Sequence, residues 1–212
     1  MTTNRIGPIP AVNPELAALL AARSGTGAWI ETYTGRRFYV LDPRPLDVDI
    51  KDIAHALSLL CRFTGHTREF YSVAQHSILV SRVCDREDAL SGLLHDGSEA
   101  YLADINSPLK HSPAMVRYRT AERHVQAAVE EHFNLPKMPS SVKLADKRLL
   151  VTEKRDLMAA TPDWEAFAGV EPLAGRIVPW APQIAEMAFL SRFHELTHPV
   201  AVALSQADGF GA

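Results

Sequence analysis

The sequence of 212 residues lacks most features that would place it in a specialised class of protein. It contains only two cysteines, Cys61 and Cys84, which is too few for a disulfide framework or a cysteine-based zinc site. No apolar run approaches the roughly 20 residues that are needed to span a bilayer, and the first residues show no signal-peptide pattern. We therefore expect a cytoplasmic protein with no membrane partner.

An excess of positive charge is also absent. The chain carries 22 Lys and Arg against 25 Asp and Glu, so its formal net charge is −3. Because affinity for a nucleic-acid polymer depends on neutralising many phosphates, this balance argues against such a partner. What the chain does have is 47% apolar residues, enough for the core of one domain, and nine histidines that need an explanation.

The spacing of apolar residues predicts an all-α protein. In the segment 50–60, apolar residues recur three and four positions apart, as they do on one face of a helix. Proline, glycine and asparagine breaks separate the further helices, which we expect at residues 72–84, 87–102, 113–133, 140–160 and 181–196.

The beginning of the chain is the exception to this helical pattern. Residues 29–33 and 37–41 are rich in β-branched and aromatic side chains and flank Gly35, which predicts a small hairpin. A short helix is expected before it, at residues 15–22. We expect a single domain, 1–212, with three parts: an N-terminal arm and hairpin (1–45), a catalytic helical core (46–160) and a C-terminal loop and helix (161–212).

Four ionisable residues lie where the helical pattern calls for apolar or small ones: His76, His95, Asp96 and Asp146. Burying even a neutral polar group without a partner costs roughly 1–3 kcal/mol, so these side chains need partners. One divalent cation would satisfy all four. Two imidazoles and two carboxylates suit Zn, Co, Mn, Ni or Fe, with coordination positions left open for water and substrate. Each of the four residues taken alone also fits an ordinary core or surface position.

The order of these residues strengthens the metal hypothesis. His76, then His95-Asp96 after 19 residues, then Asp146 after a further 50, resembles the H…HD…D signature of the HD-domain metal-dependent phosphohydrolases. The segment 95–110 is similar to the HDxxE…D…P-x-K stretch of bacterial 5′-deoxynucleotidases. Phage dNTP triphosphohydrolases, including dATP-directed enzymes, look similar over the same stretch. The resemblance implies an HD-domain helical bundle that hydrolyses a deoxynucleotide.

A cation at these four residues would supply the chemistry of hydrolysis. It would lower the pKa of a bound water to about 7 and polarise a phosphoryl oxygen, so that the activated water attacks phosphorus. Glu99 lies three residues after Asp96, near the ligand face of a helix, where it can handle a proton. Arg62 offers a planar fork of donors for phosphate, and Lys110 offers a second positive charge.

Further substrate contacts come from the resemblance. The pair Arg62-Phe63 matches the Arg-aromatic pair that precedes the first ligand in the 5′-deoxynucleotidases, and Phe63 is a candidate for stacking on a base. Asp104 would bind the sugar 3′-hydroxyl and crowd a 2′-hydroxyl; the alternative is a helix cap before Ser107. His66 can touch phosphate from its loop, and Mg would accompany a triphosphate substrate.

Two other functions stay open at this point. One is an alarmone or cyclic-nucleotide hydrolase of the same superfamily, although alarmone hydrolases usually have a Glu-Asp pair where this chain has Ser98-Glu99. The other is a metal-stabilised nucleotide-binding module without turnover, which a Glu99 that pointed away from the metal would favour. Relatives are commonly homodimers or higher homo-oligomers, and one apolar helix face offers an interface or a core contact: Ile184, Met187, Ala188, Leu190 and Phe193.

Overall fold

The computed structural model describes residues 27–161 and 164–198. Near its start, β1 (Ile30–Glu31) pairs antiparallel with β2 (Arg37–Phe38), with Ile30 opposite Phe38. Gly35 lies in the connecting turn with a φ of +79°, a conformation that glycine adopts without strain. Within the described residues this hairpin is the only sheet, as predicted, and its strands are shorter than expected. The helix predicted at 15–22 lies outside the described residues.

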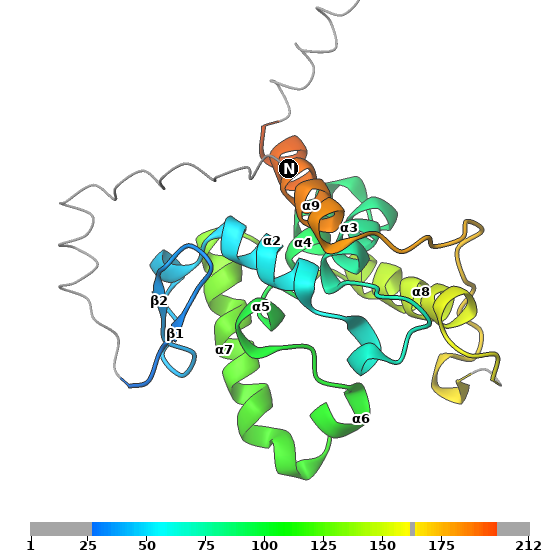
Figure 1. Cartoon of the computed structure of the whole chain (residues 1–212), viewed down its shortest axis with the longest axis horizontal. Coiled ribbons are helices and arrows are strands. Elements are labelled where there is room, and N and C mark those ends of the chain that lie inside the picture. Colours follow the sequence, from blue (N-terminus) through cyan, green and yellow to red (C-terminus); the bar gives the residue numbers. More distant parts are fainter. Residues whose placement is uncertain (1–26, 162–163, 199–212) are drawn as a thin grey trace, which may run out of the picture.

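Helices form the rest of the framework, which confirms the predicted all-α class with a small hairpin (Figure 1). The longer helices are α2 (Ile50–Leu59), α3 (Val73–Val83), α7 (Val116–His132), α8 (Ser140–Leu157) and α9 (Pro182–Thr197). The shorter ones are α4 (Ala89–Leu94), α5 (Glu99–Leu102) and α6 (Ser107–Lys110). Single 3₁₀ turns connect them: η1 (Pro45–Asp47), η2 (Arg62–Gly65), η3 (Arg86–Asp88), η4 (Pro113–Met115) and η5 (Glu165–Phe167).

One predicted helix is broken in the structure. The expected helix at 87–102 is divided into η3, α4 and α5, because the chain tightens between Leu94 and Glu99. There the amide of Gly97 donates to Leu94 O, three residues back, instead of four. A Cβ at Gly97 would lie 3.1 Å from Cγ1 of Val129, so this turn packs tightly against α7.

The central element of the bundle is α3, which packs against α2, α4, α8 and α9. The hydroxyl of Ser72 caps its first turn by accepting from the amide of Gln75. Two apolar clusters meet on this helix: Ile78 belongs to the larger one, and Val80 packs with Leu149 of α8 in the smaller one. The consecutive residues His76, Ser77 and Ile78 of α3 are therefore all fully buried, although two of them are polar.

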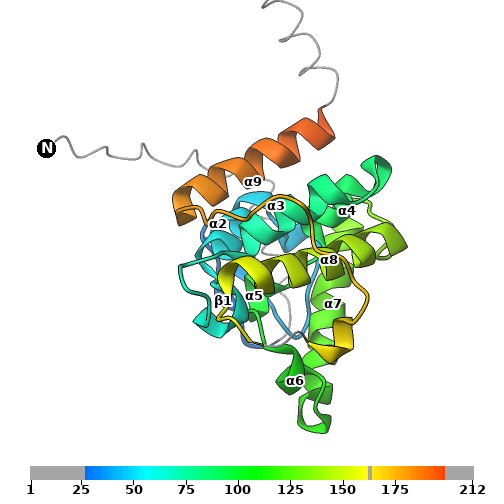
Figure 2. The ribbon, with the colours of Figure 1, turned by 90° about the vertical axis from the view of Figure 1, so that its right-hand side faces the viewer.

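Helix α9 lies at one end of the molecule and α6 at the opposite end (Figures 1 and 2). Ala185 and Phe189 of α9 are fully buried in the larger cluster. Other members of the predicted apolar face also pack against that cluster: Ala188, Leu190 and Phe193. Only Ile184 and Met187 of this face are exposed, so most of it serves the core of this chain.

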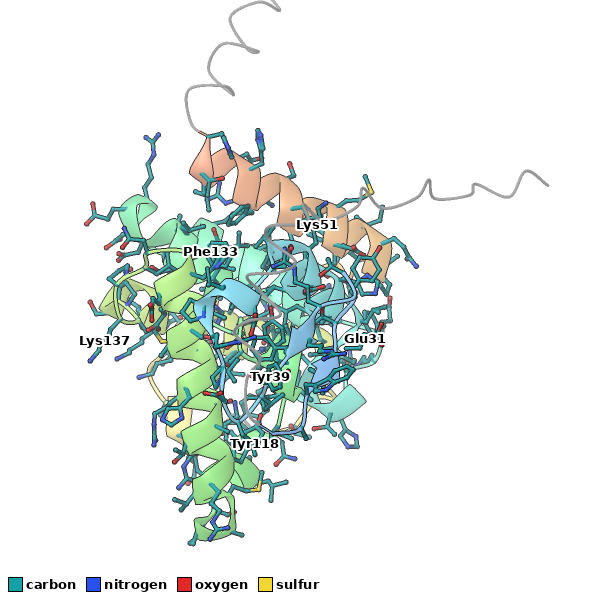
Figure 3. All side chains as sticks on the ribbon, turned by 90° about the vertical axis from the view of Figure 1, so that its left-hand side faces the viewer. Glu31, Tyr39, Lys51, Tyr118, Phe133 and Lys137 are labelled. Atoms are coloured by element: carbon teal, nitrogen blue, oxygen red, sulfur yellow. The ribbon has the colours of Figure 1, made fainter. Side chains whose placement is uncertain are left out.

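On the side of the hairpin, α7 runs along the molecule, with Tyr118 near its beginning and Phe133 directly after its end (Figure 3). Helix α7 contacts η1, where Nδ1 of His132 donates to the carbonyl of Pro45 at 2.6 Å. The hairpin itself is tied to α2, because both carboxylate oxygens of Asp52 accept from Thr34. No helix in the described part of the chain is long and apolar enough to cross a membrane.

Candidate metal centre

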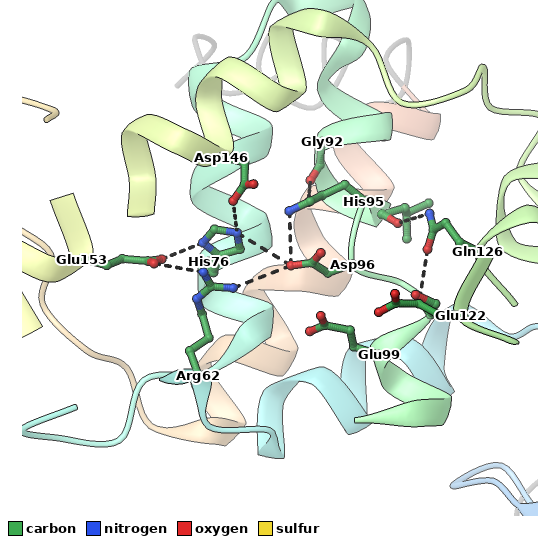
Figure 4. Close-up of polar contacts among 12 residues, drawn as sticks. Arg62, His76, Gly92, His95, Asp96, Glu99, Glu122, Gln126, Asp146 and Glu153 are labelled. Atoms are coloured by element: carbon green, nitrogen blue, oxygen red, sulfur yellow. Dashed lines mark hydrogen bonds and ion pairs between the residues drawn. The ribbon is translucent and has the colours of Figure 1, made fainter. Parts of the chain in front are cut away.

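Three segments bring the four predicted metal ligands together (Figure 4). His76 comes from α3, His95 and Asp96 from the tight turn after α4, and Asp146 from α8. Donor atoms of His76, His95 and Asp146 all lie within 4.8 Å of one another. Oδ2 of Asp96 lies 3.2 Å from Nε2 of His95 and 3.8 Å from Nε2 of His76. Residues up to 70 positions apart therefore form one cluster.

Both imidazoles turn the same ring nitrogen into this cluster. Nδ1 of His95 donates to Gly92 O at 2.8 Å, and Nδ1 of His76 lies 2.6 Å from Oε1 of Glu153. These contacts leave both Nε2 atoms facing the acids, and both are buried with no hydrogen-bond partner in the described part of the chain. Two unpartnered imidazole nitrogens beside two carboxylates fit a divalent transition metal, which would bind the four residues as ligands.

The acidic and basic groups of the cluster stabilise each other in their charged forms. Burial opposes ionisation of Asp96, but His95, His76 and Arg62 outweigh it and hold the pKa of that carboxyl well below its usual range. Burial likewise opposes a charge on His95, yet Asp96 and Asp146 raise its pKa to about 9. The acids thus stabilise positive charge at the position that a cation would take.

Arg62 lies beside the cluster in η2. Its Nη1 is 3.7 Å from Oδ2 of Asp96, and its Nη2 is 3.1 Å from Oε2 of Glu153. Its Nε is buried and has no hydrogen-bond partner among the residues that the structure describes. The next residue, Phe63, has a φ of +54° and lies under the guanidinium, whose carbon is 5.3 Å from the ring centroid. Such a left-handed conformation is strained for a bulky residue and is often found at functional sites. Trp164 faces Phe63 at 6.2 Å between ring centroids.

Glu99 begins α5 and is 5% exposed. Figure 4 shows its carboxyl directed towards the side of the cluster where Asp96 lies. Its Oε1 is 3.4 Å from Nζ of Lys110, while its Oε2 is buried and accepts no hydrogen bond from residues 27–161 or 164–198. Burial, together with the nearby Asp96 and Asp104, raises the pKa of Glu99 well above its ordinary value. Glu99 is thus an acid that retains a proton more readily than usual.

Lys110 is already engaged with acids. Besides its contact with Glu99, its Nζ lies 2.7 Å from Oε1 of Glu122 on α7. The sequence predicted a phosphate contact for Lys110, and the structure places it at the rim of the cluster, where its charge is shared between two carboxylates. A phosphate that reached Lys110 would compete with them.

Asp104 follows α5 through a sharp change of direction at Ala103, whose φ is +73°. Burial raises the pKa of Asp104, Arg62 opposes this shift and Asp96 adds to it, so the residue lies within the electrostatic field of the cluster. It does not cap the following helix, because the side chain of Asn106 caps α6. The alternative of a helix cap is therefore wrong for Asp104.

The structure does not bring His66 to the cluster. Its side chain is exposed after η2 and makes no hydrogen bond or ion pair with the described residues. His55, one helix earlier, also lies elsewhere: its ring stacks on Tyr33 at 3.7 Å and its Nδ1 is 3.1 Å from Glu186.

Sequence reasoning missed Glu153 and Tyr71. Glu153 is fully buried and accepts from the Tyr71 hydroxyl at 2.9 Å in addition to its contacts with His76 and Arg62. The only signal was its spacing: Glu153 lies seven residues, or about two turns, after Asp146 and hence on the same face of α8.

Comparison with known proteins identifies relatives along most of the chain. No family model matches it. A protein of Escherichia coli K12, named uncharacterized protein YfdR, is 38% identical over 173 residues, which are 80% of this chain and 96% of that protein. A second protein, from Rhodobacter capsulatus and also named uncharacterized, is 36% identical over 152 residues, which are 67% of this chain and 74% of the relative.

Proposed function

The chain belongs to the family of the Escherichia coli protein YfdR, and we propose that it is a divalent-metal-dependent phosphohydrolase of deoxynucleotides. The proposal covers two reactions: removal of triphosphate from a dNTP such as dATP, and removal of orthophosphate from a 5′-deoxynucleotide. It includes membership of the HD-domain superfamily, whose signature the ordered ligands resemble. Free Cys61 and Cys84 are in keeping with a reducing, cytoplasmic location.

The observation that carries the proposal is the convergence of two unpartnered imidazole nitrogens on two carboxylates. Nε2 of His76 and Nε2 of His95 are both buried, and Asp146 Oδ1 lies 3.2 Å from the former. A metal held by these residues and Asp96 would supply an activated water and an electrophile for the phosphoryl group. Asp146 keeps a side chain that is 43% exposed, so one side of the cluster is accessible to substrate.

Arg62 is the best-placed phosphate-binding residue. Its Nη2 is held by Glu153, its Nη1 makes only a 3.7 Å ion pair with Asp96, and its Nε has no hydrogen-bond partner among the described residues. Nε and Nη1 therefore have hydrogens left for an incoming anion. A guanidinium fork binds phosphate through two parallel hydrogen bonds, which fixes the orientation of the group as well as its position. Arg62 would thus hold the phosphate beside Asp96.

The position of Glu99 favours an enzyme over a nucleotide-binding module without turnover. A non-catalytic module is favoured by a Glu99 directed away from the ligands, whereas here the carboxyl is buried and directed to the cluster side (Figure 4). Its raised pKa suits a group that accepts a proton from water and returns it to the leaving oxygen. Asp104 would bind the sugar 3′-hydroxyl and exclude a 2′-hydroxyl, and Mg would accompany a triphosphate.

Product analysis tests the proposal. Metal-free protein is incubated with Mn, Co, Zn or Mg and each dNMP and dNTP, and orthophosphate and triphosphate are separated by chromatography. We expect the wild type to release either orthophosphate or triphosphate, and the product identifies the reaction. Product release should be lost in Asp96→Ala and retained in the control Asp85→Ala, because Asp85 is exposed. Equal turnover by Asp96→Ala, or hydrolysis only of an added alarmone or cyclic nucleotide, contradicts the proposal. Absence of turnover with every metal also contradicts it.

A further inference from the structure

A buried acid that the proposed reaction does not use joins two parts of the site. Glu153 has no exposed surface, yet its two oxygens contact three side chains from other segments. Oε1 lies 2.6 Å from Nδ1 of His76 and accepts from Tyr71, while Oε2 accepts from Nη2 of Arg62 at 3.1 Å. One carboxylate thus connects a predicted metal ligand with the predicted phosphate-binding arginine (Figure 4).

The carboxylate determines which nitrogen of His76 faces the cluster. An ionised carboxylate can only accept hydrogen bonds, so Nδ1 of His76 carries the hydrogen and Nε2 keeps its lone pair in the neutral ring. Nε2 is the atom that lies 3.2 Å from Asp146 and 3.8 Å from Asp96. Glu153 therefore orients the ring and selects the tautomer that can bind a metal.

The same carboxylate determines where Arg62 rests. The guanidinium lies between two acids, with Glu153 at 3.1 Å and Asp96 at 3.7 Å. Without the charge of Glu153, Asp96 is the nearest anion left for the guanidinium among the described residues. Arg62 would then pair with Asp96 and compete with a cation for it.

We propose that Glu153 is a positioning residue shared by the metal and phosphate subsites, because its carboxylate holds His76 for the metal and Arg62 for the phosphate. This inference rests on the proposed function, since it assumes that a cation binds at His76 and a phosphate at Arg62. Loss of the carboxylate weakens both subsites together.

The test compares Glu153→Gln with a matched control on the same helix. Gln keeps the size of the side chain but removes its charge, and it cannot accept from His76 and Arg62 at once without turning an NH₂ group towards one of these donors. Asp156→Asn is the control, because Asp156 lies one turn further along α8, its side chain is 2% exposed, and it contacts Arg155 outside the cluster. Both variants are checked for folding by circular dichroism.

The readouts are metal and anion binding, measured by calorimetry without substrate turnover. For Glu153→Gln we expect Mn²⁺ to bind about 10–100-fold more weakly than to the wild type. At saturating Mn²⁺ we expect the affinity for inorganic triphosphate to fall as well. The visible spectrum of the Co²⁺-loaded variant should also differ from that of the wild type, whereas Asp156→Asn should match the wild type in all three measurements.

A second variant covers the case in which Glu153→Gln does not fold. Glu153→Asp keeps the charge but is one methylene shorter, so its carboxylate cannot reach His76 and Arg62 at their present distances. We expect an intermediate loss of Mn²⁺ affinity. Unchanged Mn²⁺ affinity and an unchanged Co²⁺ spectrum in the folded variants overturn this inference, while wild-type turnover leaves the proposed function intact. A wild type that binds no Mn²⁺ overturns both.

Discussion

His95 and its neighbour Asp96 turn their side chains onto each other, with Nε2 of the histidine 3.2 Å from Oδ2 of the acid. Adjacent residues in a regular helix point about 100° apart, so this contact depends on the tight turn between α4 and α5. The ring is further fixed by its hydrogen bond to Gly92 O. The break in the helix is thus what allows consecutive residues to serve one site.

The His95–Asp96 pair makes the stability of the metal-free protein depend on pH. Burial opposes the His95 cation, but Asp96 and Asp146 raise its pKa to about 9, whereas an unfolded histidine titrates near 6.5. A raised pKa stabilises the folded state fully below pH 6.5, and this contribution is lost as pH rises through about 9. At about 1.4 kcal/mol per pKa unit, the contribution is at most roughly 3.5 kcal/mol.

Urea unfolding of the chelator-treated protein measures this dependence. We expect the difference in free energy of unfolding between wild type and His95→Gln to shrink between about pH 6 and about pH 9.5. A difference that stays constant over this range contradicts a raised pKa of His95.

Glu99→Gln should separate catalysis from metal binding. The amide cannot take up and return a proton, so we expect the rate of product release to fall by about 10²–10⁴-fold. The affinity for Mn²⁺ should stay within a few-fold, because Glu99 is outside the four-ligand cluster. The control is Glu131→Gln on the exposed side of α7. A variant that keeps wild-type turnover rules Glu99 out as the proton carrier.

Asp104→Asn should reduce the preference for deoxyribose. A hydrogen bond to a charged group contributes roughly 1.5–3 kcal/mol, so loss of the charge should lower the ratio of deoxynucleotide to ribonucleotide turnover by tenfold or more. The measurement is kcat/KM for a matched pair of nucleotides with the same base. If the ratio does not change, Asp104 does not take part in recognition of the sugar.

Phe189→Ala should destabilise the protein strongly, because Phe189 of α9 is fully buried in the larger apolar cluster. We expect a loss of about 3–5 kcal/mol in the free energy of unfolding. Met187→Ala, two residues earlier on the same helix with a side chain that is 68% exposed, should change it by less than about 0.5 kcal/mol. Equal effects in urea unfolding would show that α9 does not pack as described.

Periodicity predicted the helices well where one face is apolar throughout. It placed α3 and α9 within about two residues of their bounds, because their buried positions recur at helical spacing. It failed at the expected helix 87–102, since the tight turn around Gly97 depends on the approach of Val129 from α7. That contact joins residues 32 positions apart and leaves no periodic signal.

Likewise, only some residues of the candidate site could be predicted from the sequence. His76, His95, Asp96 and Asp146 could be found from sequence, because ionisable residues on apolar faces are conspicuous and their order matches a known signature. Glu153 could not, because one glutamate in a charged helical stretch looks like a solvated residue. Only the packing of α8 on α3 shows that it is buried.

The most direct test of the central claim is the anomalous scattering of a metal in crystals of the Mn²⁺- or Zn²⁺-loaded protein. We predict a peak between His76, His95, Asp96 and Asp146, at about 2.0–2.2 Å from Nε2 of both histidines and from a carboxylate oxygen of each acid. The peak should be absent in Asp96→Ala. A metal bound elsewhere, or none between these residues at concentrations that support hydrolysis, would contradict the account.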